Sequence, residues 1–139
     1  SENYVFEYGE HRFNVKGFFA EGTTYFYNTS SKHEAYYLCA IFNSNELNEK
    51  IKPLQTKGTF GPRDIHQTVF QFNIPLYDSK NKSHNKLSEI AMDCNKKINK
   101  VLENTTKKSS AGVRGEIRTH LKSEMGSIDK MVKLLLNSS

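Results

Sequence analysis

Apolar and polar residues alternate in the first part of the chain. In residues 12–16, Phe13 and Val15 alternate with Arg12 and Lys16. A period of two is typical of a β-strand that buries one face. The pattern therefore places Arg12 and Lys16 on the outer face of a strand. Strands are predicted at residues 4–8, 12–16 and 24–27.

A helix is predicted to follow these strands. Ser31 and Glu34 have the spacing of a capping box, in which the serine side chain accepts a hydrogen bond from a first-turn amide and the glutamate reaches back. Pro53 must lie beyond the end of the helix, because proline has no N–H and its ring clashes with the preceding turn. The predicted buried stripe contains Tyr37, Leu38, Ile41, Phe42, Leu47 and Ile51.

The next two segments of the chain have different residue patterns. Residues 56–66 contain Gly58, Gly61 and Pro62, and we expect them to be irregular. Residues 68–75 return to alternation, which predicts another strand. Because Pro75 has no N–H to donate to a central ladder, this strand is expected to lie at an edge or to stop before the proline.

Two helical patterns follow a polar connection at residues 78–85. In each, apolar residues recur at a mean spacing of about 3.5, which is typical of a helix with a narrow apolar seam. A linker rich in Ser and Lys, around residues 105–112, separates them. The first seam contains Leu87, Ile90, Cys94, Ile98 and Val101. The second contains Val113, Ile117, Leu121, Met125, Ile128, Val132 and Leu135.

Together these patterns predict an α+β fold. Residues 1–77 are expected to form a small β-rich α/β unit. Residues 84–137 are expected to form an antiparallel helical hairpin, packed on that unit or on a partner. A second copy of the chain is one candidate partner for these helices. A length of 139 residues suits about one domain.

The composition is that of a water-soluble protein, with 36% hydrophobic residues and a mean hydropathy of −0.68. No apolar run approaches the length that a membrane span needs, so we expect no membrane role. Residues 1–3 have neither a basic nor an apolar leader pattern, which favours a cytoplasmic location. Cys39 and Cys94 lie within helical patterns and are interpreted as reduced core residues.

The net charge of +5 favours a polyanionic partner. Each phosphate that Lys or Arg neutralises releases condensed counterions, which stabilises the complex. The pairs Lys96-Lys97 and Lys107-Lys108 are candidate phosphate contacts, although basic residues on a solvated helix face are the commoner explanation.

Motifs for catalysis are missing from the sequence. It has no phosphate-binding loop of the Walker type, no dinucleotide fingerprint, no His-Glu-x-x-His zinc motif and no nucleophile elbow. Its five histidines are scattered. We therefore expect no catalytic residue, no metal site and no cofactor bound by this chain. Asp64 and Glu34 could join a metal site of a nuclease, but no Asp…Glu-x-Lys arrangement accompanies them.

The glycine-containing turn at residues 58–67 is the strongest candidate for a binding site. Its glycines allow the backbone to approach a ligand closely, and Arg63, His66 and Gln67 are donors of the kinds that read base edges or contact phosphate. The alternative is that Arg63 pairs with Asp64 and only fixes the turn. Candidate DNA contacts are Arg12, Lys16, Lys57, Arg63, His66 and Gln67.

Several of these segments together resemble a known family. The residues that carry the resemblance are Tyr36-Tyr37-Leu38, Ala40-Ile41, Asn43-Ser44, the turn from Gly58 to His66, and Ile74-Pro75-Leu76. In that order they resemble the C-terminal specificity, or target-recognition, domain of type IIG and TaqI-like adenine DNA methyltransferases of restriction–modification systems. The helices at residues 84–137 are similar to the helical tail that follows this region. The family's catalytic Asn-Pro-Pro-Tyr tetrapeptide is absent.

The resemblance implies a sequence-recognition module for double-stranded DNA. The catalytic methyltransferase domain, with its S-adenosylmethionine, would lie on the N-terminal side in a longer polypeptide. There the target adenine is flipped out of the duplex while the recognition module holds the neighbouring bases. The main alternative is a protein-interaction module, in which the helical hairpin docks on a catalytic partner without reading bases.

Overall fold

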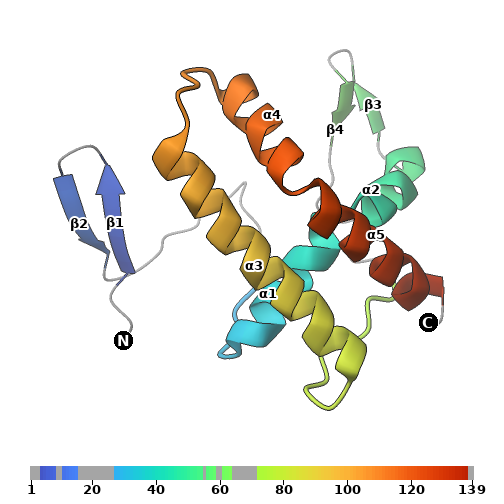
Figure 1. Cartoon of the computed structure of the whole chain (residues 1–139). Coiled ribbons are helices and arrows are strands. Elements are labelled where there is room, and N and C mark those ends of the chain that lie inside the picture. The colour runs from blue at the N-terminus through green and yellow to red at the C-terminus, as the bar shows by residue number, and fades with distance from the viewer. Residues whose placement is uncertain are drawn as a thin grey trace.

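The computed structural model describes residues 27–54 and 72–137 in full, together with the backbone of four short strands (Figure 1). The helices are α1 (Lys32–Phe42), α2 (Asn45–Ile51), the 3-10 turn η1 (Lys52–Leu54), α3 (Lys82–Asn104), α4 (Ser110–His120) and α5 (Lys122–Asn137). The strands are β1 (Tyr4–Tyr8), β2 (His11–Val15), β3 (Thr56–Gly58) and β4 (Gly61–Arg63).

The predicted α+β fold with a β-rich unit is wrong. The strands form two separate antiparallel pairs, with Phe6 opposite Phe13 in one and Gly58 opposite Gly61 in the other. A two-stranded hairpin is at best marginally stable by itself and offers little surface for a core. In the part of the chain that the structure describes, the core is instead built from helices.

The helical core joins the two halves of the chain. α3 crosses α1, and this is the most extensive helix–helix contact (Figure 1). α5 packs against α2 and α3, and α4 against α3 and α5. The buried cluster consists of Tyr37, Ala40, Ile41, Leu47, Ile51, Leu87, Ala91, Cys94, Leu121, Ile128 and Val132. The burial of these apolar side chains is the main source of stability for the bundle.

The start of α1 confirms the predicted Ser31 cap, since the Ser31 side chain accepts a hydrogen bond from the Glu34 amide at 3.2 Å. Glu34 does not reach back to the Ser31 amide, however. That amide donates to Thr29 Oγ1 at 3.0 Å, and the Thr29 hydroxyl in turn donates to the Glu34 carboxylate. A threonine therefore stands between the two members of the capping box.

The single helix predicted from Ser31 towards Pro53 is interrupted at Asn43 and Ser44. Ser44 is 1% exposed, and its hydroxyl donates to the Ile41 carbonyl at 2.7 Å while accepting the Leu47 amide at 3.2 Å. The Ser44 side chain thus hydrogen-bonds a carbonyl in the last turn of α1 and also caps the N-terminus of α2. The chain turns there, which directs Leu47 and Ile51 into the same core as Ile41.

The strand predicted at residues 68–75 is not found in its described part, because residues 72–78 have no regular structure. Here the chain lies against helices rather than against another strand. The Tyr37 hydroxyl donates to the Pro75 carbonyl at 2.9 Å, and the Tyr77 and His84 rings contact the Tyr37 ring at 5.5 and 4.7 Å between centroids. Phe72 and Ile74 also pack on the core, so their alternation reflects packing of an extended segment.

The predicted first seam, Leu87 to Val101, lies in α3 and faces the core, with Ile90 and Ile98 half-buried. The second pattern covers two helices, because the helix is interrupted at the buried residue Leu121.

Cys94 is buried in the core as predicted, whereas Cys39 is exposed, and both are free thiols. Among the described residues, no helix is both long enough and apolar enough to cross a membrane.

Candidate nucleic-acid interface

The six residues predicted to contact DNA lie outside the residues whose side chains the structure describes. The backbones of Lys57 and Arg63 are placed, on the two strands of the β3–β4 pair, where Thr56 is opposite Arg63 and Lys57 opposite Pro62. The segment predicted to be irregular therefore contains a short hairpin. Arg12 belongs to β2, while Lys16, His66 and Gln67 are outside the described residues.

Positive charge gathers in another part of the molecule. Residues 96–122, which we call the basic segment, contain eight Lys and Arg but only two Asp and Glu. The other 112 residues contain twelve basic and thirteen acidic residues. The whole positive excess of the chain therefore lies in this segment. Its basic residues are Lys96, Lys97, Lys100, Lys107, Lys108, Arg114, Arg118 and Lys122.

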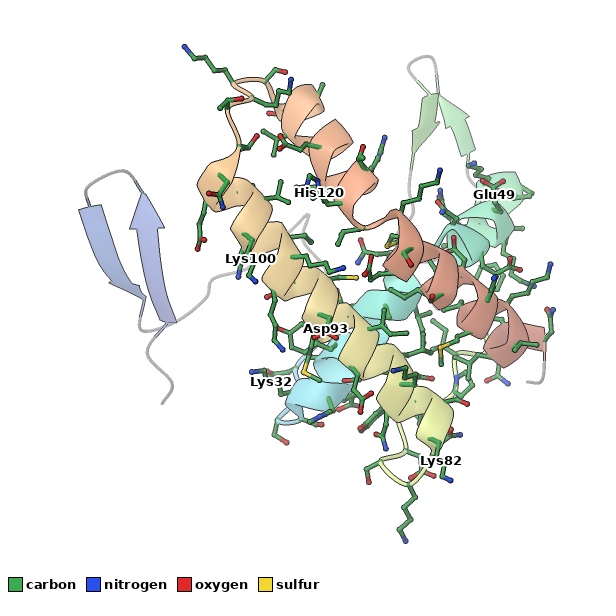
Figure 2. The ribbon with its side chains drawn as sticks, viewed as in Figure 1. Lys32, Glu49, Lys82, Asp93, Lys100 and His120 are labelled. Carbon is green, nitrogen blue, oxygen red and sulfur yellow. The ribbon has the colours of Figure 1, made fainter. Side chains whose placement is uncertain are left out.

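The basic segment occupies the last nine residues of α3, the following linker, α4 and the start of α5. It forms the corner where α3 turns back into α4, between the labelled Lys100 and His120 in Figure 2. All eight basic side chains are exposed. α4 itself has no buried residue, so this helix presents most of its surface to solvent.

Hydrogen bonds fix the turn that carries Lys107 and Lys108. The Thr105 hydroxyl donates to Glu116 of α4 at 2.5 Å and accepts the Lys107 amide at 3.2 Å. Ser109 caps α4 by accepting the Gly112 amide at 3.1 Å. A Cβ added at Gly112 would lie 3.3 Å from Lys107 Cβ, so the turn packs tightly against the first turn of the helix. The two lysines are thus held beside the positive end of the α4 dipole.

A groove of about 490 Å³ continues this surface between α3 and α5. One side is a stripe along α3 at helical spacing, in which two or three residues separate successive members. The stripe consists of Lys86, Ile90, Asp93, Lys97 and Lys100. Lys96, which also lines the groove, pairs with Asp93 at 3.3 Å, whereas no carboxylate of the described residues pairs with Lys100.

The other side of the groove comes from α5 and contains Ser123, Glu124 and Ser127. The Glu124 carboxylate accepts a hydrogen bond from Lys97 Nζ. This hydrogen bond lowers the pKa of Glu124 and raises the pKa of Lys97, so both groups stay charged near neutral pH. The second oxygen, Glu124 Oε2, is occluded and has no hydrogen-bond partner among the described atoms.

These features are typical of a surface that binds anions. Among the described residues, no group of three or more His, Cys, Asp and Glu could hold a metal ion. Of the two carboxylates considered for a nuclease site, Glu34 is engaged with Thr29 and Tyr27 at the start of α1, and Asp64 is outside the described residues. Exposed lysines along a groove are typical contacts for phosphate.

The Lys96-Lys97 and Lys107-Lys108 pairs were recognised in the sequence as candidate phosphate contacts, but Lys100, Arg114, Arg118 and Lys122 were not recognised as members of the same surface. A charge count over successive segments would have found the surface, because the imbalance is confined to 27 consecutive residues.

Comparison with protein-family models, with curated proteins and with solved structures finds no match to this chain.

Proposed function

We propose that this chain is a DNA-binding module that holds the phosphate backbone of a duplex on its basic segment. The observation that carries the proposal is the confinement of the whole positive excess to the exposed corner formed by α3 and α4. A duplex carries a dense, regular array of negative charge, and its neutralisation by a fixed basic surface releases counterions.

The resemblance noted above supplies the class of system in which such a module acts. On this proposal the chain positions DNA for an adenine methyltransferase domain that lies elsewhere and binds S-adenosylmethionine. Phosphate contacts by the basic segment set the position of the duplex, and the turn at residues 58–67 reads base edges. The two tasks are separate, so they are tested separately.

The phosphate contacts are tested by duplex binding at several salt concentrations. Each phosphate contact contributes about 0.9 to the slope of log K against log salt. The double variant Arg114→Gln/Arg118→Gln removes two exposed charges of α4. We expect the affinity to fall about tenfold and the slope to decrease in magnitude by about 2, measured by fluorescence anisotropy with a labelled duplex.

The matched control is Lys130→Gln/Lys133→Gln, which removes two exposed charges of α5 outside the basic segment. Its salt slope should stay close to that of the unaltered chain. Equal losses in both double variants would mean that only net charge matters, and the assignment of the surface would then be wrong. Absence of duplex binding at low salt, together with self-association in sedimentation, would instead support the protein-interaction alternative.

Base reading is tested by selection from a pool of randomised duplexes. If Arg63 contacts a guanine, Arg63→Ala should blur one position of the selected motif at a cost of about 1–3 kcal/mol. Retention of DNA without any enriched motif would show that this chain contacts phosphates only.

A further inference from the structure

The groove between α3 and α5 contains an internal ion pair, and one of its members is a lysine that lines the groove. Lys97 lies in the α3 stripe, one turn before Lys100, and its ammonium group donates to Glu124 of α5. The side chain of Lys97 is 48% exposed and that of Glu124 only 20% exposed. The carboxylate therefore lies deeper in the groove than the lysine, between α3 and α5.

Glu124 is hydrogen-bonded to a side chain at only one of its two carboxylate oxygens in this position. One carboxylate oxygen binds Lys97, whereas Oε2 is occluded from solvent and has no partner among the described atoms. An ionised oxygen that is removed from water without a hydrogen bond carries a desolvation cost. Movement of Glu124 out of the groove would recover that hydration and would leave Lys97 without its counter-ion.

The groove also offers groups that suit a phosphate better than a carboxylate. Lys100 has no carboxylate partner among the described residues, and Ser123, an exposed residue, lines the opposite wall. A phosphate has more acceptor oxygens than a carboxylate, so it can engage two ammonium groups and a hydroxyl together. Lys97 and Lys100 are about 4.5 Å apart along the helix axis, close enough to contact one phosphate.

From this geometry we propose that the groove between α3 and α5 is a binding site for one phosphate group, which displaces Glu124 from Lys97 and lies between Lys97, Lys100 and Ser123. Where the phosphate belongs to a duplex, this proposal rests on the proposed function and names one contact within it. A free phosphate has the same chemistry, so the experiment includes both sources.

The first measurement compares duplex affinities of two variants that each remove one negative charge. Glu124→Gln frees Lys97 in the groove, while Glu49→Gln neutralises an exposed carboxylate of α2 that also pairs with a lysine, Lys52, but lies outside the groove and the basic segment. We expect Glu124→Gln to raise the duplex affinity about tenfold over Glu49→Gln, since charged hydrogen bonds are worth more than a distant charge. Circular dichroism verifies that both variants are folded.

A second pair removes one positive charge each and does not depend on Glu124. Lys100→Gln should lower duplex affinity several-fold more than Lys108→Gln, which removes an exposed charge of the same basic segment outside the groove. In parallel, inorganic phosphate is titrated into the unaltered chain and into Glu124→Gln. Amide resonances of Lys97, Lys100 and Ser123 should shift, with half-saturation at a lower phosphate concentration in the Glu124 variant.

The outcomes separate the two proposals. If the duplex binds through the basic segment but each groove variant matches its control, the groove proposal is overturned and the proposed function stands. If phosphate shifts the groove resonances and no variant binds duplex, the groove is a site for free phosphate and the proposed function fails. Neither proposal survives if duplex and phosphate both fail to bind.

Discussion

Ser88 is a polar residue inside the apolar core. Its side chain is fully buried on α3, and its hydroxyl has no hydrogen-bond partner among the described atoms. A buried hydroxyl without a partner costs about 1–3 kcal/mol, and alanine also favours the helix more than serine does. Ser88→Ala should therefore raise the free energy of unfolding by about 1 kcal/mol, measured by urea denaturation.

Ser127 provides the matched control for this prediction. Its hydroxyl is exposed on α5 and donates to the Ser123 carbonyl at 3.1 Å. Ser127→Ala should change stability by no more than about 0.5 kcal/mol. A loss of stability in Ser88→Ala would show that the hydroxyl is hydrogen-bonded in solution.

Tyr37 makes the stability of the protein sensitive to alkali. Burial raises the pKa of its hydroxyl to about 12, and the same hydroxyl donates to the Pro75 carbonyl. In the unfolded chain a tyrosine ionises near pH 10, about two units lower. Above pH 10 the unfolded state therefore binds fewer protons than the folded state, and stability falls as the pH rises towards 12. Below pH 10 this contribution is complete.

The corresponding experiment compares urea midpoints at pH 9, 10 and 11. Tyr37→Phe should be less stable at pH 9, by about 1 kcal/mol for the lost hydrogen bond. It should also lose less stability between pH 9 and 11 than the unaltered chain. Tyr27→Phe, which alters a tyrosine that is 61% exposed, should retain the full alkaline loss. Parallel curves for Tyr37→Phe and the unaltered chain would contradict this assignment.

At the scale of elements, α2 is a short helix held in place by a distant residue. Both oxygens of Asp129 on α5 accept from Asn45, one from the backbone amide at 2.7 Å and one from the side-chain amide at 2.9 Å. A carboxylate at the N-terminus of a helix also interacts favourably with the helix dipole. The position of α2 therefore depends on α5 as well as on its own cap, Ser44.

Asp129→Ala should release α2 from α5. We expect a loss of about 1–2 kcal/mol and faster hydrogen exchange of the α2 amides than of those in α3. Asp93→Ala is the control, because Asp93 is exposed and its ion pair with Lys96 lies within its own helix. A surface pair of this kind contributes at most about 1 kcal/mol. Equal exchange rates in α2 for both variants would show that Asp129 does not hold the helix.

The same elements show which parts of the fold can be predicted from sequence. The Ser31 cap and the seam of α3 depend on neighbours within one or two turns, and the sequence predicts both. The end of α1 was missed because the apolar stripe continues in register through Leu47, and only the run Asn43-Ser44-Asn45 hints at a turn. The contact that holds α2 joins Asn45 to a residue 84 positions away. Such a contact leaves no local pattern.

The error in fold class has a similar cause. Alternation at Phe72 and Ile74 is the pattern of a strand, yet these side chains pack on helices without a partner strand in the described part of the chain. Periodicity reports which side chains are buried and not what covers them. The basic surface was missed for a different reason. A net charge of +5 over the whole chain is modest, and the strong positive excess appears only when the basic segment is counted separately.

At the scale of the whole molecule, residues from both ends of the described chain share one core. Tyr37 and Ile41 of α1 lie in the same buried cluster as Leu87 of α3 and Val132 of α5. A shared core favours a single cooperative unfolding transition. The placement of the tyrosines allows this to be measured, because all seven lie between residues 4 and 77.

Tyrosine fluorescence therefore reports on the first part of the chain, whereas α3, α4 and α5 provide most of the helical circular dichroism signal. We expect the two probes to give the same urea midpoint. Val132→Ala removes buried methyl groups from α5, at a cost of about 2 kcal/mol, and should lower both midpoints equally although α5 contains no tyrosine. If only the circular dichroism midpoint moved, α3–α5 would unfold independently of α1, and the basic segment could then be studied without the preceding residues.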